Sequence, residues 1–327
     1  MKIGKVSESI LKRSVLRQIK TKRYEVVNGA ALGGDCAIFA LAKDTGFASC
    51  MKEGDLSFFP VSHLIIKCAN NLAAAGAEPF AIMLTLLLPE SLEEPQLKEI
   101  MKEAEETCAS LKMQIAGGQT SVIKSVNNPM AVVTGYGKIV EGKEYSAKNA
   151  KAGQDIVLSK WTGLEGTAYL AKKNKEFLAK RYPLYFVETA AEFDQYLSVV
   201  PEAQIAIKSG VCAMHDVSEG GIFSALWELC EGAGVGLDID LKRIPLRQET
   251  VEVCEHLGKN PYELISGGCL IMTTEDGPGL VEALERQGIF SAMIGKLTDS
   301  NDRIIRNEEE VRYMDRPKQD ELFKEEN

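Results

Sequence analysis

Apolar residues recur along the chain with two periods, one typical of β-strands and the other of α-helices. Residues 80–88 form an unbroken apolar run, which predicts a buried strand. Residues 62–75 and 91–111 repeat apolar positions every three or four residues, so each predicts a helix with one buried face. Ser91 and Glu94 would form a capping box at the second helix. Strands and helices thus alternate, which predicts an α/β fold.

The other segments continue this alternation. Further strands are predicted at 115–120, 129–140, 155–159, 211–214, 235–239, 269–273 and 290–296. Further helices are predicted at 164–178, 187–197, 201–208, 246–257 and 279–287. Residues 46–60 are polar and irregular, which indicates a loop or a short edge strand. Residues from Arg306 onward are highly charged and predict an exposed tail.

The length of the chain predicts two domains. A chain of 327 residues is long enough to bury two separate cores. The segment 147–152 is small and polar, and strands and helices resume after it. We therefore predict an N-terminal domain over residues 1–150 and a C-terminal domain over residues 151–327.

Composition narrows the class of protein. The sequence is 45% hydrophobic and 26% charged, which is ordinary for a soluble globular protein. Its net charge of −9 argues against nucleic acid as a partner. No apolar run approaches the length of a membrane span, so we expect no membrane partner. The 8 cysteines form no C-x-x-C pair, which is typical of reduced thiols in a cytoplasmic protein without a zinc site.

One stretch of the second half combines polar residues, two glycines and a helical apolar pattern. Gly220 and Gly221 allow a backbone or a ligand to approach closely, and an amphipathic helix follows them. Ser218 is the expected N-cap, with Asp216 and Glu219 near the positive end of the helix dipole. Helix starts of this kind suit anions, or carboxylates that hold a metal ion. An ordinary capped helix after a tight turn is the alternative, and the stretch alone leaves both open.

Double glycines recur at four places in the chain, namely 33–34, 117–118, 220–221 and 267–268. Asp35 directly follows the first pair and Gln119 the second. Several such pairs at strand-to-helix junctions, beside acidic residues, are typical of phosphate loops that converge on one crevice. Ordinary turns use glycine pairs as well, so this interpretation also stays open.

Five motifs together carry a resemblance to a known family. They are A-L-G-G-D-C-A-I (31–38), C-A-N-N-L-A-A-A-G-A-E-P (68–79), G-G-Q-T (117–120), A-K-A-G-Q-D-I-V (150–157) and H-D-V-S-E-G-G (215–221). In this combination and order the sequence resembles the aminoimidazole ribonucleotide (AIR) synthetase, or PurM-like, superfamily, in its HypE-like branch. The resemblance implies two α/β domains, a dimer formed through the sheets of the N-terminal domain, and ATP in a cleft that the second subunit partly closes.

The resemblance also implies site residues, position by position. Those implied to bind the nucleotide are Gly33, Gly34, Asp35, Asn71, Gly117, Gly118, Gln119, Thr120, Asp216, Glu219, Gly220 and Gly221. Asp35 and Asp216 are the implied metal ligands. The family usually has acidic residues where this chain has Met51 and Asn71, and an acidic residue or a histidine where it has Gln119. Magnesium prefers carboxylate oxygens, so the resemblance implies a weakened magnesium site.

We therefore expect a homodimer that uses ATP and magnesium to phosphorylate an amide or related oxygen of an unidentified small-molecule or protein substrate, with reduced turnover. The alternatives are an active enzyme whose metal ligands have moved, and a non-catalytic subunit that pairs with an intact paralogue. The terminal cysteine that carries the substrate group in HypE has no counterpart, since Cys269 is the last cysteine. We also expect Asp35, Asn71 and Gln119 to line one cleft, faced by residues 216–221.

Overall fold

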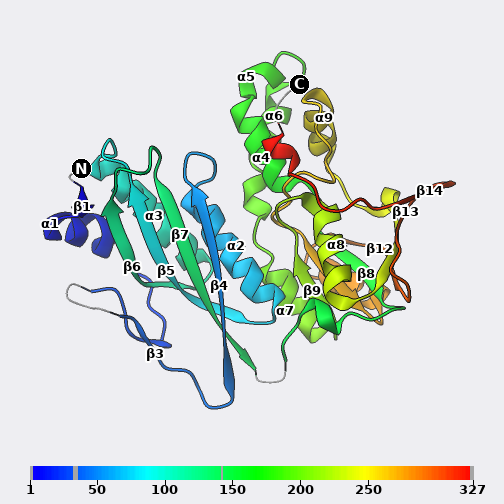
Figure 1. Ribbon diagram of the computed structural model, residues 1–327, viewed down its shortest axis with the longest axis horizontal. Coiled ribbons are helices and arrows are strands. Elements are labelled where there is room, and N and C mark those ends of the chain that lie inside the picture. Colours follow the sequence, from blue (N-terminus) through cyan, green and yellow to red (C-terminus); the bar gives the residue numbers. More distant parts are fainter. Residues whose placement is uncertain (1–2, 32–35, 141–142, 325–327) are drawn as a thin grey trace. The chain divides into compact units, whose positions relative to one another are not determined.

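The computed structural model describes residues 3–31, 36–140 and 143–324. The chain divides into two compact units (Figure 1). The first unit comprises residues 1–73 and 77–144, and the second comprises residues 74–76 and 145–327. Both units combine sheets and helices, which confirms the predicted α/β, two-domain PurM-like architecture.

The first unit is built on a five-stranded sheet in the order β1-β6-β5-β7-β4. Its strands are β1 (Gly4–Lys5), β4 (Thr45–Asp55), β5 (Glu78–Leu88), β6 (Gln114–Val122) and β7 (Met130–Val140). A small separate hairpin is formed by β2 (Val26–Asn28) and β3 (Ile38–Phe39). Only β5 and β6 are parallel, because the helix between them returns the chain to the same end of the sheet.

Helices cover one face of this sheet. They are α2 (Val61–Ala74) and α3 (Glu94–Ser110); in Figure 1, α2 lies beside β4 and α3 near β5 and β6. The fully buried Ile82, Leu86 and Leu88 of β5 point to this helix side, as alternation along a strand requires. The other face bears the half-exposed Met83, Thr85 and Leu87 of β5, and we call it the open face. Phe39 of the β2–β3 hairpin packs there against Phe80 and Tyr136. Short helical segments precede β2, at α1 (Glu8–Ile10), Leu11–Val15 and Leu16–Gln18.

Two local predictions for the first unit need correction. The segment predicted as a loop or short strand contains the 11-residue edge strand β4, which pairs only with β7. An edge strand with one open face needs few apolar residues, so its alternation is weak in the sequence. The cap of α3 lies two residues later than predicted: the backbone N–H of Glu93, rather than a group of Ser91, bonds to the Gln96 side chain at 2.8 Å.

The second unit contains a seven-stranded sheet in the order β14-β13-β10-β12-β8-β11-β9. Its strands are β8 (Asp155–Ser159), β9 (Ala213–Asp216), β10 (Gly236–Asp240), β11 (Leu270–Thr274), β12 (Ser291–Thr298), β13 (Arg303–Asn307) and β14 (Glu310–Tyr313). All pairs are antiparallel except β10 with β13. The central strand β8 is buried along its whole length, which matches its position between covered faces.

Helices surround this second sheet. They are α4 (Leu164–Lys173), α5 (Lys175–Leu178), α6 (Leu184–Ala191), α7 (Val200–Lys208), α8 (Gly221–Ala233), α9 (Gln248–His256) and α10 (Gly277–Glu285). Short 3₁₀ turns occur at Ala147–Asn149, Phe193–Tyr196, Leu241–Arg243 and Glu321–Phe323. Helix α8 contributes Ile222, Leu226 and Leu229 to a core shared with β8 and β10. None of the helices in the described ranges is long and apolar enough to cross a membrane.

The predicted exposed tail is wrong in part. Residues 303–307 and 310–313 form strands β13 and β14, of which β14 is at the edge of the sheet, and the following segment returns to the body of the second unit. Asp320 in that segment is only 1% exposed. A charged side chain is usually exposed because burial removes its hydrogen bonds to water. The carboxylate of Asp320 can be buried because backbone N–H groups donate hydrogen bonds to it in place of water.

Candidate functional site

A hollow of the first unit lies beside β6. This cavity of about 290 Å³ is walled by α3, by β5 and β6, by the N-terminal helical segments and by the ends of the segment that joins β2 to β3. Strand β1 pairs with β6 only at Ser121 and Val122, so the cavity lies beside the part of β6 that β1 leaves unpaired. Its size is near the lower end of small-molecule sites.

The cavity brings together parts of two predicted glycine loops. Gly117, Gly118, Gln119 and Thr120 all line it. The residues on either side of the first glycine pair, 30–31 and 36–37, also line it. The pair itself, Gly33 and Gly34, and the predicted metal ligand Asp35 lie outside the described residues. Two segments more than 80 positions apart in the sequence therefore meet at one hollow.

The wall of the cavity is mostly neutral. Its apolar side chains come from Leu11, Val15, Leu16, Ile19, Met83, Leu84, Met101 and Ile115. Gln119 and Thr120 add an amide and a hydroxyl, and none of the described lining residues is charged. A hollow with apolar and polar groups but no charged side chain suits the uncharged ring of a ligand better than its phosphates.

A charged cluster fixes the chain as it enters the wall of the cavity. The carboxylate of Glu25 is 1% exposed and accepts hydrogen bonds from Nη2 and Nε of Arg23, at 2.7 and 3.0 Å, and from the Lys138 ammonium at 2.8 Å. Burial raises the pKa of Glu25, but these cationic donors outweigh burial and bring it to about 2. The backbone N–H of Arg23 also donates to the Gln114 side chain at 2.6 Å. The start of the β2–β3 hairpin is thereby tied to β6 and β7.

The second glycine pair has a packing role that the sequence did not reveal. Gly118 has φ +147°, and a Cβ there would lie 1.8 Å from the carbonyl oxygen of Leu84. Only glycine allows β5 and β6 to approach this closely. A Cβ on Gly117 would meet the Met83 sulfur at 2.9 Å, which is a flexible neighbour. A side chain at position 118 would therefore force β5 and β6 apart, whereas one at position 117 would meet only the flexible side chain of Met83.

The sheet separates Asn71 from Gln119. Asn71 lies on α2, which packs on the helix side: a Cβ on Gly135 of β7 would lie 3.1 Å from the Cβ of Cys68 in α2. Gln119 lies on the open face, because it pairs with Thr85 two positions beyond the contact of Gly117 with Met83, and positions two apart share one face of a strand. Within this unit the two amides therefore do not meet in one cleft.

The side chain at position 51, where the family usually has an acidic residue, points to solvent. Met51 is 61% exposed on the open face of β4. Its neighbour Cys50 faces α2, where its thiol donates to the carbonyl oxygen of Cys68 at 3.3 Å. On β4, therefore, the side chain of Cys50 faces α2, and that of Met51 points to the opposite side of the sheet.

The described residues do not supply a magnesium site. No group of three or more His, Cys, Asp or Glu side chains among them is arranged to hold a metal ion. Asp216, the second predicted ligand, ends β9 in the second unit, paired with Leu270. Asn71 and Gln119 offer only neutral oxygens and lie on opposite sides of the first sheet, so these two amides do not share a metal ion within this unit.

The loop from Asp216 to Gly221 forms the start of α8 in the second unit. Gly220 and Gly221 have φ +76° and +67°, and a Cβ on Gly221 would lie 2.4 Å from the carbonyl oxygen of Tyr262. The predicted cap Ser218 is wrong: Gly220 is the N-cap, and no side chain caps the helix from that position. Glu219 is exposed. The glycines therefore let the loop pass close to the backbone of the segment around Tyr262.

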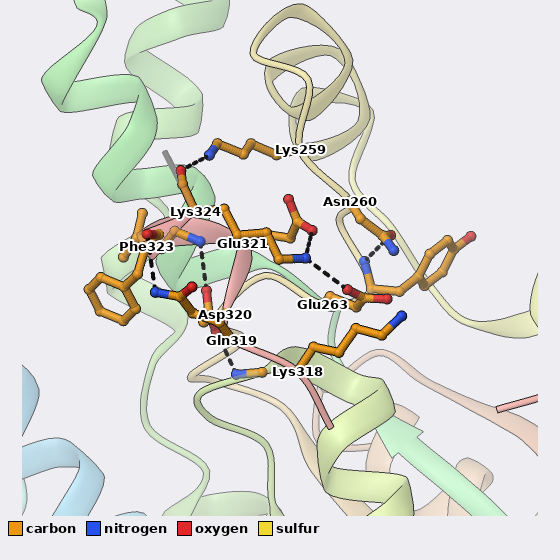
Figure 2. Close-up of polar contacts among 12 residues, drawn as sticks. Lys259, Asn260, Glu263, Lys318, Gln319, Asp320, Glu321, Phe323 and Lys324 are labelled. Carbon is orange, nitrogen blue, oxygen red and sulfur yellow. Dashed lines mark hydrogen bonds and ion pairs between the residues drawn. The ribbon is translucent and has the colours of Figure 1, made fainter. Parts of the chain in front are cut away.

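A residue that the sequence analysis missed completes this loop. The carboxylate of Asp320 accepts a hydrogen bond from the backbone N–H of Gly220 at 2.5 Å. Figure 2 shows Asp320 within the polar contacts of the C-terminal segment. No motif marks this residue, since it is one of many charges in residues 306–327. Only the fold shows that an anion already occupies the start of α8.

Comparisons with known proteins cover both units. A family model described as AIR synthase related protein, N-terminal domain, matches residues 33–139, and the model of the C-terminal domain matches residues 151–306. A protein of Methanocaldococcus jannaschii, provisionally named for hydrogenase expression or formation, is 26% identical over 315 residues, which is 92% of this chain and 90% of that protein. The carbamoyl dehydratase HypE of Rhodobacter capsulatus is 28% identical over 205 residues, which is 62% of this chain and 58% of that protein.

A solved structure shows the same fold. The crystal structure of a hydrogenase maturation protein HypE in complex with ATP superposes with a TM-score of 0.81 and 17% identity. The match covers 98% of this chain and 97% of that chain. At this level of identity the likeness speaks for the fold alone.

Proposed function

The chain belongs to the AIR synthase related protein family, and from this premise we propose that it is an ATP-binding protein of the HypE-like type. The single observation that carries the proposal is the cavity beside β6, where the flanks of the first glycine loop meet Gly117 to Thr120. The neutral wall suits the base of a nucleotide. In the second unit, the start of α8 binds a carboxylate through the N–H of Gly220, so this loop by itself suits an anion.

The neutral side chains of Asn71 and Gln119 favour slow phosphoryl transfer. Transfer of a phosphoryl group depends on positioning and on neutralising its charge, for which magnesium is the usual means. The described residues do not fit magnesium, as Asn71 and Gln119 are neutral and do not converge. We therefore propose that ATP binds and that its transfer to an amide or related oxygen is slow. The HypE-like substrate class, a carbamoyl group as in the relatives named carbamoyl dehydratase, is part of this proposal.

Filling the cavity should abolish ATP binding. Ala30 is half-buried in the cavity wall, and Ala30→Trp would place a large ring in a hollow of about 290 Å³. We expect ATP affinity to fall at least about tenfold, since the ring competes for the same space. Isothermal calorimetry with ATP measures this directly. Ala109→Trp, at an exposed position on α3, is the matched control and should bind as the native protein does. Equal affinities in all three proteins would refute the cavity as the nucleotide site.

The open face of the first sheet supports a homodimer as part of the proposal. Along β7 and β5 it presents Val132, Thr134, Met83 and Leu87 half-exposed, and Met51 is 61% exposed. An uncovered sheet face on which apolar side chains lie among polar ones can form the interface with a second copy.

A charge on the open face should split the dimer. Val132 pairs with Thr85 near the middle of the sheet, so Val132→Arg would bury an unpaired cation between the two copies. Analytical ultracentrifugation should show a dimer for the native protein at micromolar concentration and a monomer for the variant. Ala109→Arg, on the surface of α3, should remain dimeric. A native protein that sediments only as a monomer would contradict the proposal.

A second candidate function follows from the poor metal site. A non-catalytic subunit that binds ATP and pairs with an intact paralogue needs the cavity and the open face, but no metal ligands. ATP binding without measurable hydrolysis by the pure protein would favour this function over slow transfer. Hydrolysis that is lost in Ala30→Trp would favour the enzyme.

A further inference from the structure

Two cysteines of the first unit lie against each other, Cys50 on β4 and Cys68 on α2. The thiol of Cys50 donates to the backbone carbonyl oxygen of Cys68 at 3.3 Å. A Cβ on Gly135 of β7 would lie 3.4 Å from Sγ of Cys50 and 3.1 Å from Cβ of Cys68, so both side chains border the same point of that strand. The two thiols also form a hydrogen bond with each other. Their sulfur atoms are therefore direct neighbours.

The two thiols differ in their access to solvent. Cys68 is 0% exposed, whereas Cys50 is half-buried. The pKa of Cys68 is raised, first by its hydrogen bond with the thiol of Cys50 and then by burial, so Cys68 keeps its proton. A small oxidant from solvent therefore meets Cys50 first, and the buried thiol of Cys68 stands behind it.

The surroundings of the pair allow a covalent bond between the two sulfur atoms. A disulfide requires these atoms about 2 Å apart and the two Cβ atoms roughly 3.5–4.5 Å apart. Gly135 pairs with Cys50 across the sheet and places no side chain at the point that both cysteines border. Strand β4 is also an edge strand that pairs only with β7, and α2 lies beside it in Figure 1. A small shift of this edge strand toward α2 therefore brings the sulfur atoms to bonding distance.

The other cysteines in the described ranges lack this arrangement. Four of them are buried, and burial raises the pKa of each thiol: Cys108, Cys230, Cys254 and Cys269. Cys36 is exposed and Cys212 is half-buried. Among the described residues, a hydrogen bond between two thiols occurs only between Cys50 and Cys68. An oxidant can therefore be expected to distinguish this pair from the single thiols.

We propose that Cys50 and Cys68 are a peroxide-reactive thiol pair, which oxidation converts into an intramolecular disulfide that holds β4 against α2. The pair is a modification site of the first unit, and its substrate is hydrogen peroxide. A thiol reductant restores the two thiols by exchange. This inference does not depend on the proposed function, because neither cysteine lines the cavity beside β6.

The reaction has two steps. The sulfur of Cys50 attacks one oxygen of hydrogen peroxide: an S–O bond forms, the O–O bond breaks, and the departing hydroxide takes the thiol proton and leaves as water. The sulfur of Cys68 then attacks the sulfur of the sulfenic acid: the S–S bond forms, the S–O bond breaks, and hydroxide leaves with the proton of Cys68 as a second water. The two thiols lose two electrons in total, and hydrogen peroxide gains them.

Hydrogen peroxide added to the reduced full chain tests the proposal directly. Mass spectrometry of the digested, non-reduced protein should show the peptide with Cys50 joined to the peptide with Cys68, with the loss of two hydrogen atoms. Dithiothreitol should reverse the link. Cys50→Ser should leave Cys68 as a thiol, because the oxidant does not reach it. Cys68→Ser should stop at the sulfenic acid on Cys50, which dimedone traps.

Cys212→Ser is the matched control. Cys212 is half-buried like Cys50 but belongs to the second unit and has no thiol neighbour there. The Cys212→Ser protein should form the link between Cys50 and Cys68 at the same rate as the native protein. A rate that falls in this variant would assign the first oxidation to Cys212 and overturn the proposal.

The link should also restrain the edge strand. Hydrogen exchange of the β4 amides should slow at least about threefold after oxidation, because the covalent bond opposes the opening of β4 away from α2. The same peroxide treatment of Cys50→Ser should leave the exchange of β4 unchanged.

The native protein by itself decides the outcome, so a variant that fails to fold leaves the test intact. The inference is supported by a link between Cys50 and Cys68 together with slower exchange in β4. It is overturned if both thiols stay reduced under peroxide that oxidises the exposed Cys36. It is also overturned if a sulfenic acid on Cys50 persists beside the thiol of Cys68, or if the linked protein exchanges as fast as the reduced one.

Discussion

Replacing Gly118 with alanine should unfold the first unit. The added Cβ would lie 1.8 Å from the carbonyl oxygen and 2.6 Å from the carbonyl carbon of Leu84, and the backbone there has φ +147°. Backbone atoms cannot turn aside as a side-chain end can, so β5 and β6 would have to separate. We expect a loss of unfolding free energy on the order of 4 kcal/mol or more, because overpacking and forbidden backbone geometry add.

The effect can be assigned to one unit. Both tryptophans, Trp161 and Trp227, belong to the second unit, so their fluorescence should keep its native urea transition. Hydrogen exchange of β5 and β6 should rise to the unfolded rate. Gly210→Ala is the matched control: Gly210 has φ +78°, but nothing lies within 4 Å of its Cβ position, so the cost should stay near 1 kcal/mol. If Gly118→Ala loses no more than this control, the close approach of β5 to β6 is wrong.

Removing one member of a buried ion pair in the second unit should be nearly as damaging. The ammonium of Lys160 lies 2.6 Å from the carboxylate of Glu202, and the side chains are 9% and 3% exposed. Lys160 also donates to the carbonyl oxygens of Tyr196 and Ser198. Glu202→Gln leaves a buried cation without its counter-charge, so we expect a loss of about 3–5 kcal/mol.

Urea denaturation followed by tryptophan fluorescence measures this loss. The double change Lys160→Met with Glu202→Gln should recover part of the stability, since no charge is then left buried. Glu188→Gln is the control, because its pair with Lys175 at 2.9 Å has side chains 47% and 49% exposed. It should cost less than about 1 kcal/mol. A loss in Glu202→Gln as small as that in the control would show that the buried pair is solvated.

Most elements could be predicted from local pattern. The run at 80–88 became β5, and the helical repeats at 62–75 and 91–111 became α2 and α3. These predictions are correct because burial of one face requires apolar residues at the period of the helix or strand, and that period can be read from the sequence. Strand β4 was not predicted as a long strand, because an edge strand with one exposed face shows only a weak alternation of apolar and polar residues.

The candidate site was predictable only in part. The G-G-Q-T segment does line the cavity, together with the flanks of the first glycine pair. Sequence spacing could not show that Asn71 and Gln119 lie on opposite sides of a sheet, because that depends on which strand face each element meets. Nor could it show that Met51, rather than Cys50, points away from α2. A shift of one residue along a strand reverses the face.

The sequence by itself determined the α/β class, the strands and helices with strong periodicity, and the family, since its motifs kept their order. The tertiary structure alone decided what the glycine pairs do: Gly118 lets two strands approach, and Gly221 lets a loop pass Tyr262. It also decided that Asp320, one charge among many, sits on the N–H of Gly220. The physical reason is the range of the interactions. Periodicity records whether a residue faces the core, whereas a contact between positions about 100 residues apart exists only once the chain has folded.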